Sequence, residues 1–292
     1  MIRQTYHIEL ITPCFCAGAD PARAEIRAAS IRGQLRWWFR VLGGNSAEEG
    51  SVFGQISQKQ ANSGAVRIAV SEFKRGPQWN PPGFSPNDAE SYTWHYARES
   101  GKEPGSGRGT SGPRWKSDGA LPPGSSFTLD FVLHRTLPPT IQRKFDQALR
   151  TFLCLGSLGL RATRGLGAIH CIEANWLDSQ LAILRESGFQ VARRTNPTSF
   201  PTWEAALKDW SAWLRYKLRS QTKAESFSAL GGINPRQTSA IRFRAIRTAD
   251  GKFSWLAFEA PHEKILERKT RPLLTPDIFT GSTPQPPPRA RR

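Results

Sequence analysis

The sequence predicts an α+β protein built in two units, each with an antiparallel sheet covered by helices. Three observations predict this class. Segments with alternating apolar residues recur along the chain, and segments with helical periodicity separate them. The length of 292 residues suits two domains of roughly 100–200 residues each. A hydrophobic content of 38%, with 25 Gly and 22 Pro, leaves room for long polar loops between core segments.

The first half supplies four strands and two helices. In chain order they are a strand at 5–12, a helix at 30–42, strands at 65–73 and 127–135, a helix at 140–156 and a strand at 168–173. Pro13 closes the first strand, and Gly43 with Gly44 ends the first helix. The order strand, helix, strand, strand, helix, strand is that of the ferredoxin-like βαββαβ fold.

The second half has fewer clear elements. An amphipathic helix is predicted at 203–219, and two strands at 240–247 and 253–260 flank a turn. These elements suit a second, degenerate ferredoxin-like unit. The tryptophan-rich face of the helix suits either a subunit interface or ordinary core. The predicted domains are 1–175 with a Gly- and Pro-rich loop or disordered stretch at 76–126, 176–283, and a basic Pro-rich tail at 284–292.

The net charge points to a phosphate-rich partner. Lys and Arg number 41 against 24 Asp and Glu, which gives +17, and most of the basic residues are arginines. The halves share the excess almost equally. No apolar run approaches the length of about 18 residues that a membrane helix needs, and the N-terminus lacks a signal-peptide pattern. We therefore expect a cytoplasmic nucleic-acid-binding protein with no membrane partner.

Three arginines form a stripe on the predicted helix 30–42. Arg32, Arg36 and Arg40 recur every fourth residue, with Trp37 at the edge of the stripe. A single acid, Glu25, lies nearby in the sequence. Phosphates along an RNA strand would satisfy the three guanidiniums, and Trp37 could stack on a base. The alternative is a solvated helix face whose arginine stems pack over the tryptophans.

Glycines mark two further places. Gly33 lies inside the predicted helix, where it costs about 1 kcal/mol relative to Ala, so we expect something to approach the backbone there. Segment 156–167 holds four glycines, together with Arg161 and Arg164. Its backbone N–H groups could face an anion, although a tight helix-to-strand connection would need the same glycines. No G-K-[ST] follows the segment, which excludes a P-loop nucleotide site.

Catalytic and metal signals are weak. The four cysteines lack the paired spacing of a zinc site, and we expect them to be reduced thiols. The five histidines are scattered without metal-ligand spacing. The sequence therefore predicts no metal and no cofactor.

Four motifs resemble those of one family over roughly residues 1–172. They read ELITPCFCAGAD, SIRGQLRWWFRVLGG, SVFGQ and LGSLGLRATRGLGAI. They are similar to the RAMP superfamily of CRISPR-associated proteins and, more narrowly, to the first-subunit family of the type III-B (Cmr) RNA-guided effector complex. The chain departs from that family in Cys14 and Cys16 and in its compact second half.

This resemblance implies two tandem, RRM-related ferredoxin-like domains and a non-catalytic subunit. Such a subunit would hold guide and target RNA near the guide 3′ end, beside neighbouring RAMP subunits. The implied RNA contacts are Arg32, Arg36, Trp37 and Arg40 in the first helix, and Gly159, Arg161, Arg164 and Gly165 in the glycine-rich loop.

Two other functions stay open at this point. Asp20 lies in the loop after the first strand, where the backbone subunits of related complexes carry an RNA-cleaving aspartate, so an RNA-cleaving RAMP subunit is the alternative. A structural subunit that contacts protein alone is the third possibility.

Overall fold

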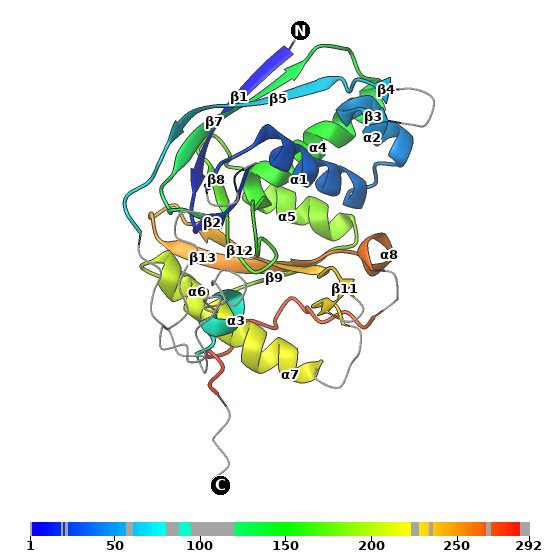
Figure 1. Cartoon of the computed structure of the whole chain (residues 1–292). Coiled ribbons are helices and arrows are strands. Elements are labelled where there is room, and N and C mark those ends of the chain that lie inside the picture. The colour runs from blue at the N-terminus through cyan, green and yellow to red at the C-terminus, as the bar shows by residue number, and fades with distance from the viewer. Residues whose placement is uncertain are drawn as a thin grey trace, which may run out of the picture.

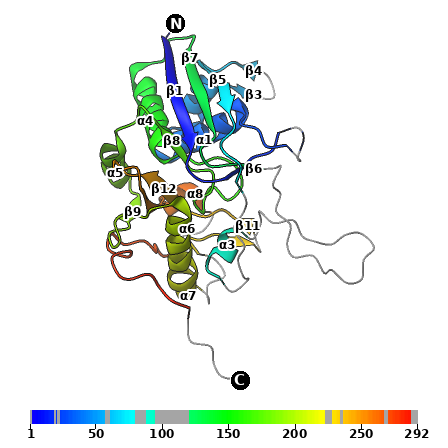
Figure 2. The same ribbon diagram turned by 90° about the vertical axis from the view of Figure 1, so that its left-hand side faces the viewer.

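Four stacked layers make up the molecule, a sheet, a helix layer, a second sheet and a second helix layer (Figure 1). The view turned by 90° shows the same stacking (Figure 2). The computed structural model describes residues 2–18, 20, 23–56, 61–79, 88–94, 120–222, 228–233, 236–266 and 270–286. The prediction of a mixed fold with antiparallel sheets is confirmed.

The first sheet has the strand order β5–β7–β1–β8, and all of its pairs are antiparallel. Central strand β1 pairs with β7 from Ile2↔Leu133 to Glu9↔Ser126 and with β8 on its other side. Its inward residues, Ile8 and Leu10, are fully buried. The strands are β1 (Ile2–Leu10), β5 (Val66–Lys74), β7 (Ser126–Leu133) and β8 (Ile169–Cys171).

Two long helices lie on one face of this sheet. Helix α1 (Ala28–Val41) follows β1, and helix α4 (Pro139–Leu155) joins β7 to β8. Their apolar stripes are the predicted ones, because Ile31 and Leu35 in α1 and Phe145 and Phe152 in α4 have no exposed surface. Each such side chain stabilises the fold by about 1.5–3 kcal/mol relative to full exposure.

The second sheet has three antiparallel strands in the order β12–β13–β9. One face packs on the helix layer of α1 and α4, and the other packs on helix α6, which continues as a π-helical segment and a short α7. The predicted hairpin at 240–260 and the predicted helix at 203–219 both correspond to these elements. The bounds are β9 (Gln190–Arg193), β12 (Ile241–Arg247), β13 (Phe253–Glu259), α6 (Trp203–Ala212), the π-helical segment (Trp213–Leu218) and α7 (Arg219–Gln221).

The tryptophan-rich helix belongs to the core. Trp203, Trp210 and Trp213 are 7%, 0% and 5% exposed, and they pack with strands β12 and β13 in the second hydrophobic cluster. The suggestion that this face is a subunit interface is therefore wrong, because the second sheet already covers it.

Several helices were not predicted from the sequence. Helix α2 begins with a capping box in which Asn45 and Glu48 exchange side-chain and backbone hydrogen bonds. Helix α3 lies inside the stretch that was predicted as loop or disorder, and Trp94 in it is fully buried in the second cluster. The remainder of 76–126 is only partly described, since 80–87 and 95–119 lie outside the described residues. The further helices are α2 (Ser46–Phe53), α3 (Glu90–Trp94), α5 (Leu177–Glu186) and α8 (His262–Ile265).

Short two-residue strands complete the described fold. They form three pairs that close loops at the edges of the main layers. The pairs are β2 (Cys14–Phe15) with β6 (Ala120–Leu121), β3 (Gln55–Ile56) with β4 (Ala61–Asn62), and β10 (Gly232–Ile233) with β11 (Arg236–Gln237).

The hydrophobic clusters do not separate at the predicted domain boundary. The first cluster holds residues of α1 and α4, and it also holds Val191, Leu256 and Phe258 from the second sheet. The two units therefore share one helix layer, and the boundary at 175/176 stays a prediction.

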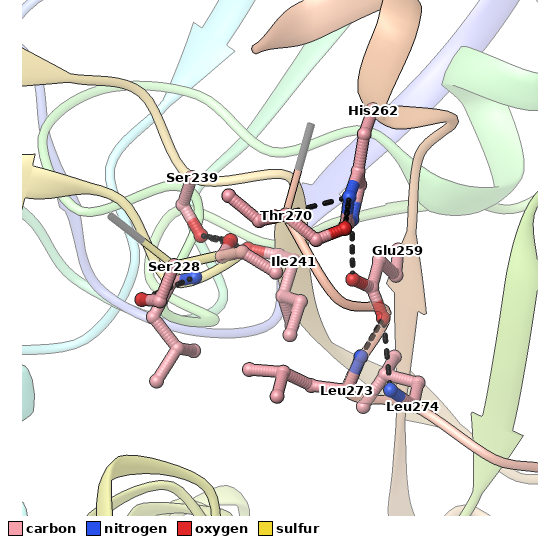
Figure 3. Close-up of polar contacts among 10 residues, drawn as sticks. Ser228, Ser239, Ile241, Glu259, His262, Thr270, Leu273 and Leu274 are labelled. Carbon is pink, nitrogen blue, oxygen red and sulfur yellow. Dashed lines mark hydrogen bonds and ion pairs between the residues drawn. The ribbon is translucent and has the colours of Figure 1, made fainter. Parts of the chain in front are cut away.

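A buried carboxylate fastens the end of the second sheet. Glu259 is 2% exposed, and its Oε2 accepts from the backbone N–H groups of Leu273 and Leu274 at 2.9 and 2.8 Å (Figure 3). Its Oε1 lies 2.6 Å from His262 Nε2, while His262 Nδ1 lies 2.8 Å from the carbonyl oxygen of Thr270. Strand β13, helix α8 and the segment 270–274 are thus held together by one side chain.

Replacing this carboxylate should destabilise the second unit. Glu259→Gln removes the charge that both the histidine and two N–H groups approach, so we expect the free energy of unfolding to fall by about 3 kcal/mol in urea titrations. Glu263→Gln, at an exposed position in α8, is the matched control and should change it by less than about 0.5 kcal/mol. Equal effects of the two substitutions would contradict the role given to Glu259.

Candidate RNA interface

Helix α1 is enclosed by the two sheets. Its Trp38 ring is 1% exposed and lies 5.3 Å from the ring of Phe258 in β13, centroid to centroid. Its Ile31 and Leu35 pack in the same cluster as Ile8 of the first sheet. A narrow edge of the helix is therefore left for contact with anything outside the chain.

Two arginines of the predicted stripe already share a carboxylate. Glu49 in α2 is 7% exposed; its Oε1 accepts from Arg36 Nε, and its Oε2 lies 3.1 Å from Arg40 Nε. Arg36 also donates to the carbonyl oxygen of Gly54 at 3.4 Å. The local sequence indicated Glu25 as the acid beside this stripe, whereas in the structure Glu49 reaches it because the capped helix α2 folds back onto α1. Arg36 consequently fixes α2, while the Arg40 side chain stays 59% exposed.

The open edge of α1 is formed by three exposed residues, Ala29, Gly33 one turn later and Arg40 two turns after that. A Cβ placed on Gly33 would meet no atom within 4 Å, so nothing inside the described chain needs a glycine there. Arg32, beside it, is half-buried, and its Nε is buried without a hydrogen-bond partner. The edge thus combines a bare stretch of helix backbone with arginines that precede and follow it.

Trp37 is covered by an arginine of the second sheet. The Arg242 guanidinium carbon lies 3.6 Å from the centroid of the Trp37 ring, and Arg242 Nη1 donates to Gln34 Oε1 at 3.4 Å. Burial lowers the pKa of Arg242 to about 10. The face that a base would stack on is therefore taken by Arg242 in this conformation.

The glycine-rich segment packs against protein. Gly159 has φ +76°, and a Cβ there would lie 2.5 Å from the carbonyl oxygen of Phe15. Gly165 has φ +87°, and a Cβ there would lie 2.7 Å from Cζ2 of the Trp210 ring. The tight connection that the sequence left open accounts for these glycines, because each lets its backbone approach a neighbour that a side chain would push away.

The arginines of this segment also point inward. Arg164 is 4% exposed and donates to Ser239 Oγ at 3.1 Å and to the carbonyl oxygen of Leu230 at 2.7 Å. Arg161 donates to the carbonyl oxygen of Thr93 at 3.1 Å and holds α3. Arg164 Nε is buried without a partner. We leave both arginines out of the RNA surface proposed below, since their other donors serve contacts within the chain.

Tyr92 lies among three arginine side chains. The guanidinium carbons of Arg219, Arg161 and Arg164 lie 4.1, 5.1 and 6.0 Å from the centroid of its ring. Burial raises the pKa of the Tyr92 phenol, but the three positive charges outweigh it, so the pKa is lowered overall. The segment 88–94 is thus tied electrostatically to the glycine-rich connection.

Asp20 lies in the loop between β2 and α1 and is exposed. In the described part of the chain, no three His, Cys, Asp or Glu side chains come together as a metal site. The four cysteines are free thiols, and burial raises the pKa of Cys154 to about 11. Across the same residues, none of the helices has the length and apolar character to cross a bilayer.

Sequence reasoning missed two residues that define this surface. Glu49 is 13 positions beyond Arg36, and the Asn45 capping signal was the clue that a helix would carry it back. Arg242 belongs to a distant strand, and nothing in the local pattern of β12 indicates that it would cover Trp37.

Replacing Gly165 and Gly33 by alanine should change the free energy of unfolding in opposite directions. Gly165→Ala forces a Cβ toward Trp210 at a positive φ, so we expect a loss of roughly 1–3 kcal/mol in the free energy of unfolding. Gly33→Ala fills open space in a helix and should add about 0.5–1 kcal/mol. Chemical denaturation of both variants checks the pair. Stabilisation by Gly165→Ala would show that the segment is not packed as described.

Two known proteins with similar sequences are both Cmr subunits. The Cmr subunit Cmr1-2 of Pyrococcus furiosus is 36% identical over 85 residues, which are 26% of this chain and 44% of that protein. The Cmr subunit Cmr1-1 of the same organism is 28% identical over 160 residues, or 52% of this chain and 42% of that protein. The chain thus spans less than half the length of these two relatives.

Solved structures share the fold. The crystal structure of apo Cmr1 from Pyrococcus furiosus matches with a TM-score of 0.52 and 20% identity, covering 94% of this chain and 91% of that one. A cryo-EM structure of the type III-B Cmr-beta bound to cognate target RNA contains a chain that matches with a TM-score of 0.52 and 11% identity, covering 88% and 94%.

The family model of the RAMP superfamily matches residues 7–170, which include β5, β7, most of β8, the second half of β1, both long helices α1 and α4, and the glycine-rich connection. This stretch is more than half of the chain. The chain belongs to the RAMP superfamily.

Proposed function

We propose that this chain is an RNA-binding subunit of a type III-B CRISPR effector complex. In that complex it would hold guide and target RNA near the guide 3′ end, against neighbouring RAMP subunits, in antiviral defence. Its similarity to the Cmr1 subunits and the net charge of +17 support this proposal. We also propose that the second sheet is a shortened copy of the first, since β12–β13–β9 repeats the order β5–β7–β1.

The observation that carries the proposal is the open edge of α1. Gly33 leaves the helix backbone bare, Arg32 is half-buried with a buried, unpartnered Nε, and the Arg40 side chain is 59% exposed. A phosphate backbone running along this edge would approach the helix at Gly33 and accept from Arg32 and Arg40 on either side. Arg36 supports this surface indirectly, because it holds Glu49 and α2 in place.

The salt dependence of RNA binding tests this surface. We expect the double substitution Arg32→Gln with Arg40→Gln to weaken binding of a guide–target RNA and to reduce the slope of log K against log salt by about 1.4–1.8, from roughly 0.7–0.9 per lost phosphate contact. Arg36 is left intact, since its loss would disturb α2. Filter binding at several salt concentrations gives both quantities.

Two further variants serve as controls for the salt-dependence measurement. Arg185→Gln, at an exposed position in α5, removes the same charge outside the proposed surface and should leave the slope nearly unchanged. Gly33→Ala should weaken RNA binding although it adds folding stability, which separates backbone approach from misfolding. An unaltered slope in the double variant would remove α1 from the RNA surface.

The positioning role makes no use of a cleaving carboxylate. Purified complex incubated with labelled complementary RNA and magnesium should give the same products with Asp20→Ala as with the parent chain, whatever the other subunits cleave. Loss of a cleavage product in Asp20→Ala alone would assign the RNA-cleaving function to this chain. Asp88→Ala, another exposed aspartate, controls for loss of charge.

A further inference from the structure

A cavity of about 70 Å³ lies where the two units meet. It is walled by α4, by the edge strand β8, by the start of α5 and by strand β12 of the second sheet. Its lining is apolar except for Cys154, Cys171, His170, Arg244 and Arg247. None of the described residues that line it is a carboxylate. The polar side of the cavity therefore carries positive charge.

Arg244 is the deepest of these groups. It is 1% exposed, and its Nη2 donates to the carbonyl oxygens of Ile169 and Cys154. Its Nε and Nη1 have no hydrogen-bond partner. A buried guanidinium with two unsatisfied nitrogens loses hydration without replacement, which is costly unless an acceptor occupies the space beside it.

Another buried arginine shows how the chain satisfies such a group. Arg194 has a fully buried side chain, pairs with Asp209 at 2.9 Å, and donates to the carbonyl oxygens of Phe279 and Gly281 at 2.6 and 2.5 Å. Arg244 has no equivalent of Asp209. Consistent with this difference, burial lowers the pKa of Arg244 to about 9.

The rim of the cavity adds a second arginine and a histidine. Arg247 Nη2 donates to Glu9 at 2.5 Å, but its Nε is buried without a partner. His170 is half-buried, and burial followed by the charge of Arg247 lowers its pKa, which favours the neutral ring; that ring can still donate one N–H. Glu173, the other nearby acid, binds His7 and Cys171 Sγ.

We propose that this cavity is an oxyanion site that takes one phosphate group, with Arg244 as its main ligand and Arg247 and His170 at its mouth. Arg244, Arg247 and His170 line the space, and arginine is the residue best suited to bind phosphate oxygens. The space admits a phosphate group but not a nucleoside. The phosphate is either the free ion or the terminal phosphate of a longer molecule that stays outside.

This site is separate from the RNA surface proposed above. It uses neither Arg32 nor Arg40, and phosphate binding can be measured without RNA. A failure of one proposal is therefore distinguishable from a failure of the other.

Phosphate binding to the full chain is the test. At constant ionic strength, replacing chloride by inorganic phosphate should raise the Tm by about 3 °C or more once phosphate exceeds its Kd tenfold, and calorimetric titration should give one site per chain. Arg244→Met should abolish both effects, and Arg247→Gln should weaken binding about tenfold. Arg143→Gln, exposed on α4, should bind as the parent chain does.

Two results would overturn the proposal and leave the cavity to water. One is the absence of saturable phosphate binding by the parent chain, and the other is equal phosphate binding by the parent chain and Arg244→Met. Should Arg244→Met fail to fold, the titrations of the parent chain and of Arg247→Gln still decide whether the cavity binds phosphate.

A competition experiment then identifies the source of the phosphate. It compares a short oligonucleotide ending in a 3′-phosphate with the same oligonucleotide ending in a hydroxyl. Displacement by the first alone indicates an RNA end, and displacement by neither indicates the free ion.

Discussion

The burial of one helix layer between two sheets is the constraint on which this structure depends. Helix α1 packs Ile31 and Leu35 into the first cluster and presses Trp38 against Phe258 of the second sheet. Its polar residues are thereby confined to one edge and to the contact with strand β12. Each arginine of α1 must therefore find a partner on β12, on α2 or outside the chain.

Many of the arginine side chains make their contacts within the fold. Arg36 and Arg40 share Glu49, Arg161 and Arg164 hold backbone carbonyls and a serine, and Arg242 lies on Trp37. Arginine suits these places because its planar fork donates in several directions and remains charged when buried. The net charge of +17 therefore overstates the charge that is available to a polynucleotide. Buried nitrogens without a partner remain on Arg32, Arg164, Arg242, Arg244 and Arg247, and Arg244 has two of them.

Local periodicity was enough to predict the main elements. The four strands of the first sheet, its two long helices and the β12–β13 hairpin lie within a few residues of their predicted bounds, because each has its own alternating or helical pattern. Strand β9 and the two-residue strands were not predicted. The site was predicted less well. Arg164 and Gly165 have the composition of an anion-binding loop, yet their neighbours Ser239 and Trp210 come from elements far along the chain. Which side of a loop faces protein is a tertiary property, and no local pattern encodes it.

The same reasoning separates Gly33 from the other glycines. Glycines 159 and 165 are explained by protein atoms that a Cβ would meet, whereas Gly33 has no such neighbour and sits where helix propensity opposes it. Gly33 is an exposed helix glycine between Arg32 and Arg36, and packing among the described residues does not require it. A partner that approaches the backbone gives it a physical reason.

The most direct measurement is a cryo-EM map of the assembled effector particle, with guide and target RNA present, at a resolution that shows arginine side chains. We expect a sugar–phosphate backbone to pass over Gly33, with phosphate oxygens within hydrogen-bond distance of the Arg32 and Arg40 guanidiniums. A map in which this edge of α1 is covered by another protein subunit or faces solvent, while the RNA runs elsewhere, would contradict the assignment.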